Sequence, residues 1–216
     1  MKIRMLTKRT LQHLTPPIIM AICRSLQSYM TSPLAKQKMS NYSRLHLACG
    51  SNILDGWANI DLSSDKKSII SWDLTKPLPV SSGTIHYIFS EHFIEHIRLG
   101  EGRDLLSECY RVLKPGGVLR VSTPNLRKII EEYLLGRLIE WSDVSWNPTT
   151  PCQMVNEALR LWGHQFVYDA DELKRAFEET GFSQVAQVEW RKSKHKGLDG
   201  LECRPFHGEI ILEGVK

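Results

Sequence analysis

The sequence predicts an α/β domain with a mostly parallel sheet, and two observations support this prediction. From residue 44 onward, short apolar segments typical of strands alternate with segments of helical period, a pattern that favours a parallel sheet covered by helices. The chain has 216 residues, of which 42% are hydrophobic and 24% charged, the composition of a globular domain with one core. No apolar run reaches the roughly 18 residues of a membrane span.

Residues 1–43 are expected to form a basic helical extension followed by a linker. No Asp or Glu precedes Asp55, whereas residues 1–54 contain eight Lys and Arg residues. Thr15-Pro16-Pro17 is a typical helix start, and we expect a helix from there to about Tyr29 and a polar linker over 31–43. A basic helix is attracted to anionic lipid, so residues 1–30 are expected either to contact a membrane peripherally or to pack on the domain.

Cysteine usage favours a cytoplasmic protein. The five cysteines are scattered and form no C-x-x-C pair, so neither a zinc knuckle nor a redox motif is indicated. A reducing compartment fits this pattern best, although an acid-free basic start also resembles an organelle transit peptide.

Seven strands are expected in the domain, which spans 44–216. They are short, apolar and bounded by turn residues, and they comprise Arg44–Ala48, Trp57–Leu62, Ser68–Trp72, Thr84–Ser90, Val118–Ser122, Val185–Trp190 and Glu209–Gly214.

Three helices are expected between these strands. Residues 102–113 have apolar side chains at helical spacing, and the run Lys114-Pro115-Gly116-Gly117 ends that helix. Leu126–Leu135 is the second helix, and the third is capped by Asp169 or Asp171 and ends at Gly181.

Residues 136–168 interrupt the alternation and are expected to be an insertion on the substrate side. They contain Trp141, Trp146 and Trp162, and long irregular insertions in compact domains are usually functional. We favour 162–168 for the acceptor pocket, where the tryptophans either stack on sugar rings or lie buried in a small core of their own.

The spacing of the first two strands predicts a missing helix. Only about eight residues separate them, whereas a parallel crossover normally needs a dozen or more and contains a helix. We therefore expect residues 15–29 or a partner chain, such as a second copy in a homodimer, to cover that face of the sheet.

Candidate ligand-binding residues follow the first four strands. Gly50 lies in the turn after the first strand, where its lack of a Cβ allows close approach of a ligand. Asp61 ends the second strand, eleven residues later, and its carboxylate suits the two hydroxyls of a ribose. Asp73 follows the third strand, where it suits an adenine amino group, and Ser90-Glu91-His92 follow the fourth.

These segments resemble a class I S-adenosylmethionine-dependent methyltransferase of the methyltransferase type 11 group. More narrowly, they resemble predicted methyltransferases associated with cell-surface polysaccharide biosynthesis. The resemblance covers roughly residues 45–182 and rests on LHLACGSN, GWANIDL, WDLTKPLP, IFSEHFIEHI, ECYRVLKPGGVLRVSTPNL and HQFVYDADELKRAFEETGF.

The resemblance implies a Rossmann-like seven-stranded sheet with an antiparallel last strand and helices on both faces. It also implies that S-adenosyl-L-methionine binds along the strand ends. The implied cofactor-binding residues are His46, Ala48, Cys49, Gly50 and Asn52 around the first turn, Asp61 and Leu62 at the ribose, Asp73 and Leu74 at the adenine, and Ser90 near the sulfonium.

The chain departs from the family pattern at three places. His46 replaces the usual acidic residue, and Ala48 and Asn52 replace two of the loop glycines. His86 replaces an acid common in the fourth strand. The thinned glycine loop leaves open an alternative function, a cofactor-binding subunit that has lost turnover and serves in protein interaction.

We expect methyl transfer to a small-molecule or saccharide acceptor, at oxygen. A hydroxyl acceptor must lose its proton, and histidine suits this role near neutral pH. His92 is the first candidate and His164 the second, with Glu91 orienting the base.

Other chemistries fit less well. His92-x-x-Glu95-His96 matches a zinc-peptidase pattern, but that pattern needs a long helix, so we expect no metal. A dehydrogenase would have two further glycines after the first strand. The Asn/Asp-Pro-Pro-aromatic run of nucleobase methyltransferases is missing after the fourth strand, so no nucleic-acid partner is expected.

Overall fold

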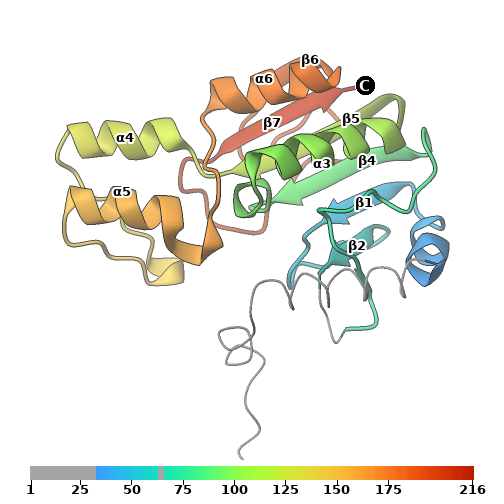
Figure 1. Ribbon diagram of the computed structural model, residues 1–216, viewed down its shortest axis with the longest axis horizontal. Helices are drawn as coiled ribbons and strands as arrows, with labels where there is room; N and C mark the ends of the chain where they lie inside the picture. Colours follow the sequence, from blue (N-terminus) through green and yellow to red (C-terminus); the bar gives the residue numbers. More distant parts are fainter. Residues whose placement is uncertain (1–32, 63–65) are drawn as a thin grey trace, which may run out of the picture.

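The computed structural model describes residues 33–62 and 66–216 (Figure 1). Its centre is one seven-stranded sheet with the order β3-β2-β1-β4-β5-β7-β6. The strands are β1 Arg44–Leu47, β2 Ala58–Asp61, β3 Ile69–Ser71, β4 Ile85–Glu91, β5 Leu113–Thr123, β6 Ser183–Gln187 and β7 Ile210–Val215. β7 pairs antiparallel with both β5 and β6, and all other pairs are parallel. The predicted seven-stranded sheet with an antiparallel last strand is confirmed.

One face of the sheet is covered by α3 (Leu99–Val112) and α6 (Ala170–Thr180), which lie across it in Figure 1. Apolar residues recur along α3 at helical spacing, so one stripe enters the main core. α6 begins at Asp169, whose side chain accepts a hydrogen bond from the Glu172 N–H, and ends at Gly181 in a left-handed conformation. Both ends of α6 are as predicted.

Part of the expected linker is helical. Residues 33–39 form a helix, and Ala35 and Met39 are buried in the same core as α3. The prediction of a linker over 31–43 was therefore wrong, because two apolar residues one helical turn apart are enough to attach this polar segment to the core. The expected helix over 15–29 lies outside the described residues, as does the membrane-contacting segment 1–30.

The opposite face of the sheet carries no helix within the described residues. The short segment between β1 and β2, residues 48–57, is irregular, which agrees with the predicted missing helix. Trp57, Phe89, Val118 and Leu198 form a small core on this face. Among the described residues this side is covered by irregular chain, the long connection 188–208 between β6 and β7.

A buried arginine attaches that connection to the sheet. Arg120 of β5 is fully buried, and its guanidinium donates to the carboxylates of Glu202 (2.5 Å) and Glu213 (2.6 Å). It also donates to the backbone oxygen of Lys192 at 2.8 Å. Two carboxylates around one guanidinium satisfy a charge that would otherwise be costly to bury.

The insertion 136–168 forms a small helical lobe with α4 (Leu126–Leu134). It contains α5 (Pro151–Arg160) and two single-turn helices, η2 (Ser142–Val144) and η3 (Leu161–Gly163). α4 and α5 lie side by side beyond one end of the sheet (Figure 1) and share a core that includes Trp146 and Met154. Sequence analysis missed α5, although the Thr150 cap and Pro151 in its first turn are typical of a helix start.

No helix in the described part of the chain is long and apolar enough to cross a membrane.

Candidate functional site

Parallel pairing brings the predicted cofactor residues to one edge of the sheet. Leu47 of β1 is level with Ser90 of β4, and Asp61 of β2 is level with Ser71 of β3. The turns that follow these four strands therefore lie side by side. Carboxyl ends of parallel strands are where open α/β sheets bind their ligands.

Gly50 and Asp61 are in direct contact at this edge. The Gly50 N–H donates to Asp61 Oδ2 at 2.9 Å, and the Leu62 N–H donates to Asp61 Oδ1 at 2.7 Å. A carboxylate has about four acceptor positions, so two remain for ligand hydroxyls. Gly50 has φ +52°, and a Cβ built there meets nothing within 4 Å, so the turn beside the carboxylate is open at Gly50.

Two buried polar atoms near this edge have no hydrogen-bond partner, namely Asn52 Nδ2 and Ser90 Oγ. Such atoms are rare in folded proteins and call for an explanation, of which a binding position for a polar ligand is one. Asp73 lies next along the edge, where its Oδ1 accepts from the Thr75 N–H (3.0 Å) and hydroxyl (2.7 Å). The edge therefore has the polar groups that a nucleoside cofactor needs.

Other predicted cofactor residues contribute through packing or backbone. Cys49 and Leu74 are buried in the core, whereas Leu62 is 42% exposed beside Asp61. Ala48 has φ +52°, a left-handed conformation that costs a residue with a Cβ roughly 1–2 kcal/mol. These residues shape this edge of the sheet through packing and backbone conformation.

His46 was wrongly placed in the cofactor cleft. Its side chain is buried, with Nδ1 3.2 Å from Asn59 Oδ1 and its ring 5.1 Å from that of Phe89. Burial lowers its pKa, so this histidine is a neutral packing residue. The reason is strand alternation, since His46 points to the helix-free face while its neighbours point to the other.

Glu91 does not orient His92, contrary to the sequence-based hypothesis. Its carboxylate is buried and turned toward residues 203–204, where it accepts from the Cys203 N–H (3.3 Å) and the Arg204 N–H (3.2 Å). Strand alternation again explains this, because Glu91 follows Phe89 onto the helix-free face. Glu91 therefore anchors the 188–208 connection at the strand ends.

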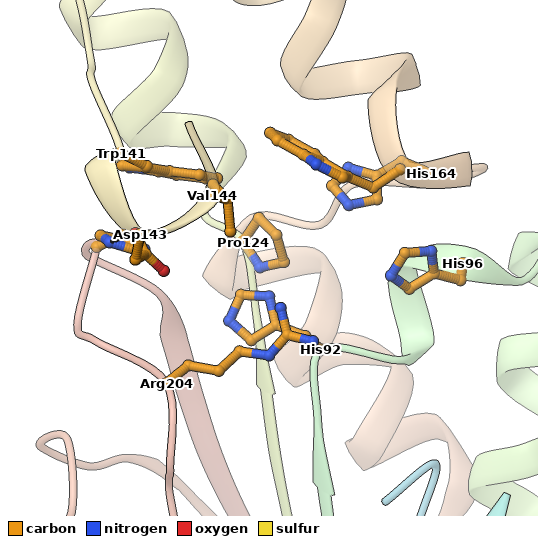
Figure 2. Close-up of a pocket in the computed structure, with 10 residues that line it drawn as sticks. His92, His96, Pro124, Trp141, Asp143, Val144, His164 and Arg204 are labelled. Atoms are coloured by element: carbon orange, nitrogen blue, oxygen red, sulfur yellow. Dashed lines mark ion pairs between the residues drawn. The ribbon is translucent and has the colours of Figure 1, made fainter. Parts of the chain in front are cut away.

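A pocket lies beyond the ends of β4 and β5, beside the proposed cofactor edge. It is a cavity of about 150 Å³. Figure 2 shows Trp141 and His164 on one side of it and His92 with Arg204 on the other. Its lining residues are His92, His96, Pro124, Trp141, Asp143, Val144, Trp162, His164, Arg204 and His207.

The indole rings in this pocket stack on each other. Trp141 and Trp162 have ring centroids 5.7 Å apart, and Trp141 also stacks on His207 at 4.7 Å. No space for a sugar ring remains between the indoles, so an acceptor would lie against their outer edges and faces. Trp146, by contrast, is buried in the core of the helical lobe.

Both ring nitrogens of His92 face carboxylates. Nδ1 lies 3.3 Å from Glu95 Oε1, and Nε2 lies 3.5 Å from Glu209 Oε1. Burial alone lowers the pKa of His92, but the carboxylates of Glu209 and Glu95 outweigh it and raise the pKa to about 9. The imidazole is thus a cation near neutral pH in this structure, with both nitrogens occupied.

His164 presents one free nitrogen to the pocket. Its Nδ1 lies 2.8 Å from the backbone oxygen of Ala158. A carbonyl oxygen only accepts, so Nδ1 carries the proton and Nε2 holds a lone pair. On geometry, His164 is better placed than His92 to accept a proton from a bound molecule.

Several pocket residues were not predicted. Arg204 and His207 come from the irregular connection between β6 and β7, and Asp143 comes from the single turn η2; none of them matches a local motif. His207 Nε2 is paired with Asp143 Oδ1 at 3.0 Å. Only the three-dimensional fold brings them together. Glu95 was visible in the sequence as part of the H-x-x-E-H pattern, but it was set aside.

The sheet order and the polar groups at the carboxyl ends of its strands are those of an α/β domain that binds a ligand at this edge. A family model described as a methyltransferase domain matches residues 32–187. The chain therefore belongs to this methyltransferase family, and the predicted resemblance to class I S-adenosylmethionine-dependent methyltransferases is confirmed.

Individual relatives agree with this membership. A probable S-adenosylmethionine-dependent methyltransferase from Mycolicibacterium smegmatis is 44% identical over 48 residues, which are 22% of this chain and 18% of that protein. The match thus spans less than a fifth of the relative's length.

Two solved structures show the same fold. A SAM-dependent methyltransferase from Archaeoglobus fulgidus has a TM-score of 0.50 at 14% identity, covering 89% of this chain and 94% of that one. Phosphoethanolamine N-methyltransferase 2 from Haemonchus contortus, in complex with S-adenosyl-L-methionine, has a TM-score of 0.51 at 14% identity, covering 87% of this chain and 52% of that one.

Proposed function

We propose that this protein transfers a methyl group from S-adenosylmethionine to an oxygen atom of a small-molecule or saccharide acceptor. The observation on which this depends is the stretch Ser90–His92. Ser90 belongs to the cofactor edge, and His92, two residues later, lines the pocket beyond β4. The end of β4 therefore joins the proposed donor and acceptor positions, and in-line transfer needs these positions to be close together.

The cofactor edge supplies the groups that hold the donor. Asp61 offers its remaining acceptor positions to the ribose hydroxyls, and Asn52 and Ser90 offer unpartnered polar atoms nearby. Asp73 lies where the adenine is expected. When bound, S-adenosylmethionine supplies an activated methyl group on a sulfonium.

The pocket supplies apolar walls with polar groups between them. Trp141 and Trp162 form a wall on which the face of a sugar or another flat acceptor can pack. Arg204 adds a guanidinium to the lining, whereas Glu95 and Glu209 offset the charge of His92. Acceptors whose acidic group reaches Arg204, such as uronic acids, are therefore favoured. His164 Nε2 is available to take the proton of an acceptor hydroxyl.

The alternative is a subunit that binds cofactor without turnover. Its support is the loop in which Ala48 and Asn52 replace glycines. Against it stand the open space at Gly50 and the formed pocket beside the donor position. We therefore propose the enzyme.

The test is a methyl-transfer assay with labelled S-adenosylmethionine and panels of acceptors grouped by chemistry: neutral sugars, uronic acids, phenols and amines. We expect S-adenosylhomocysteine to form together with a labelled oxygen-linked product. Binding of S-adenosylmethionine without transfer to any class would favour the subunit, and transfer to the amines alone would refute the oxygen assignment.

A matched pair of tryptophan variants locates the acceptor. Trp162 and Trp190 are both partly exposed (39% and 36%), but only Trp162 lines the pocket. Trp162→Ala should lower kcat/KM for the acceptor roughly two- to tenfold, the value of one aromatic contact, with unchanged cofactor affinity. Trp190→Ala should behave like the wild type. Equal losses in both variants would place the acceptor elsewhere.

A further inference from the structure

Two residues of the H-x-x-E-H pattern, Glu95 and His96, form a three-residue cluster with His164. Glu95 and His96 lie in η1 (Ile94–His96), a single turn after β4, and His164 follows η3. One ligand atom from each of these residues lies within 4.8 Å of the others. Glu95 Oε1 is 3.8 Å from His96 Nε2, and the two imidazole centroids are 4.9 Å apart.

Glu95 is a buried carboxylate with one unsatisfied oxygen. The side chain is fully buried, and Oε2 accepts from the Thr123 hydroxyl at 2.9 Å. Oε1 has no hydrogen-bond partner. The nearest side chains to Oε1 are two imidazoles, with His92 Nδ1 at 3.3 Å and His96 Nε2 at 3.8 Å. His92 is shared with the Glu209 carboxylate, so it offsets the burial of Glu95 only in part, which favours a further cation at Oε1.

The surrounding chain orients the ligands. The Ala158 carbonyl oxygen holds His164 Nδ1, which leaves Nε2 free to coordinate, and the Thr123 hydroxyl holds the carboxylate. Hydrogen bonds of this kind from outer residues are typical of metal ligands. The backbone N–H groups of Gln165 and Phe166 both donate to the Glu95 carbonyl oxygen, at 2.7 and 3.2 Å, so the two ligand-bearing segments are fastened together.

The backbone around the cluster adopts uncommon conformations. His92 (φ +52°) and Trp162 (φ +59°) are both left-handed, which costs a non-glycine residue roughly 1–2 kcal/mol. Such conformations collect at functional sites. They direct His92 and His164 toward one pocket, where Figure 2 shows His96 and His164 on the same side.

We propose that Glu95, His96 and His164 bind a divalent first-row transition-metal ion at the edge of the acceptor pocket. Two imidazoles and one carboxylate suit Zn²⁺, Mn²⁺, Fe²⁺ or Co²⁺, whereas Mg²⁺ and Ca²⁺ prefer oxygen ligands alone. Three protein ligands leave coordination positions open, as in catalytic metal sites. His96 and His164 both line the pocket, so those positions are accessible to an acceptor.

The role of the ion, unlike its binding, rests on the proposed methyl transfer. An acceptor hydroxyl bound to the ion loses its proton to water more readily. Its oxygen then forms the bond to the methyl carbon, while the sulfur keeps the electron pair of the broken S–C bond. His164 Nε2 then coordinates the ion and no longer accepts the proton. The ion, instead of His164, activates the acceptor hydroxyl.

The test is metal binding by the full-length protein after treatment with a chelator. Calorimetric titration with Zn²⁺, Mn²⁺, Co²⁺ and Mg²⁺ should show one equivalent of a transition-metal ion and weak or no Mg²⁺ binding. Bound Co²⁺ should give the visible absorption of a mixed nitrogen and oxygen site. His96→Asn and His164→Asn should each weaken metal binding at least tenfold. Loss of a residue that only hydrogen-bonds to a metal ligand already weakens binding about tenfold, and loss of a ligand should cost no less.

His207→Asn is the matched control, because His207 lines the same pocket but is paired with Asp143. His96 is partly exposed, so its variant should fold, and a thermal melt of the metal-free protein checks this. Wild-type affinity in both ligand variants, or no ion bound by the folded wild type, would overturn the site. Metal binding without methyl transfer would support the metal site and refute the proposed function. Methyl transfer without a bound ion would support the proposed function and refute the metal site.

Discussion

Replacing Asp61 by asparagine tests the cofactor edge with little change in shape. Asp61 already accepts one hydrogen bond on each carboxylate oxygen, from the N–H groups of Gly50 and Leu62. Its remaining two acceptor positions are those proposed for the ribose hydroxyls. Asparagine keeps one oxygen, replaces the other with an NH₂ donor and removes the charge.

The magnitude follows from the number of bonds lost. A hydrogen bond to a charged group contributes about 1.5–3 kcal/mol, and Asp61→Asn removes at least one such bond to the ligand. The Kd for S-adenosylmethionine should therefore rise roughly 10- to 150-fold. The free energy of unfolding should fall by only about 1 kcal/mol, because the new NH₂ faces one of the two backbone N–H donors at a partly exposed strand end.

Calorimetry with S-adenosylmethionine and S-adenosylhomocysteine measures the effect without requiring an acceptor. Asp55→Asn is the matched control, because Asp55 is exposed in the loop between the same two strands, and it should bind like the wild type. A folded Asp61→Asn protein that binds within about twofold of the wild type would refute the reasoning. An equal loss in the Asp55 variant would show that net charge, rather than a ribose contact, sets the affinity.

Three further predictions concern stability and reactivity. Arg120→Met should lower the free energy of unfolding by about 3–5 kcal/mol in urea titrations, since it leaves buried carboxylates unpaired, whereas Arg127→Ala, in an exposed ion pair, should cost under about 1 kcal/mol. Gly214→Ala should cost about 1–3 kcal/mol in the same titration, because its Cβ would lie 2.7 Å from the Phe177 ring; an unchanged midpoint would contradict that packing. Cys152, which is exposed, should react with a maleimide before the other described cysteines, because burial raises the pKa of each of those thiols. Peptide mass spectrometry can show the order of reaction.

The sheet and the cofactor edge could be predicted from the sequence because their signals are local. A buried strand ends in a small-residue turn at Gly50, and acids follow the next two strands at Asp61 and Asp73. Parallel pairing then places these residues at one edge whatever the rest of the chain does. The alternation of side chains within a strand was the information overlooked, since it directs His46 and Glu91 to the helix-free face.

The acceptor pocket could be predicted only in part. Trp162 and His164 were noticed because the insertion is rich in aromatic residues, and His92 because it ends a strand. Arg204 and His207 come from the connection between β6 and β7, which has no periodicity and no motif. Their position depends on contacts between residues far apart in the sequence, which no local pattern encodes.

The connection 188–208 both covers the helix-free face of the described structure and contributes residues to the pocket. Because no helix covers the face of β1 and β5 opposite α3 in the described structure, the connection 188–208 lies there. Arg120 of β5 attaches this connection to the sheet through Glu202.

Glu91 fixes the same connection one residue further along, at the ends of the strands, by accepting from Cys203 and Arg204. The following residues are thereby delivered to the pocket, where Arg204 and His207 form part of the lining. Within the described residues, the irregular chain on this face thus supplies charged side chains to the pocket that we propose for the acceptor. A helix packed flat on the sheet would not bring them to the strand ends.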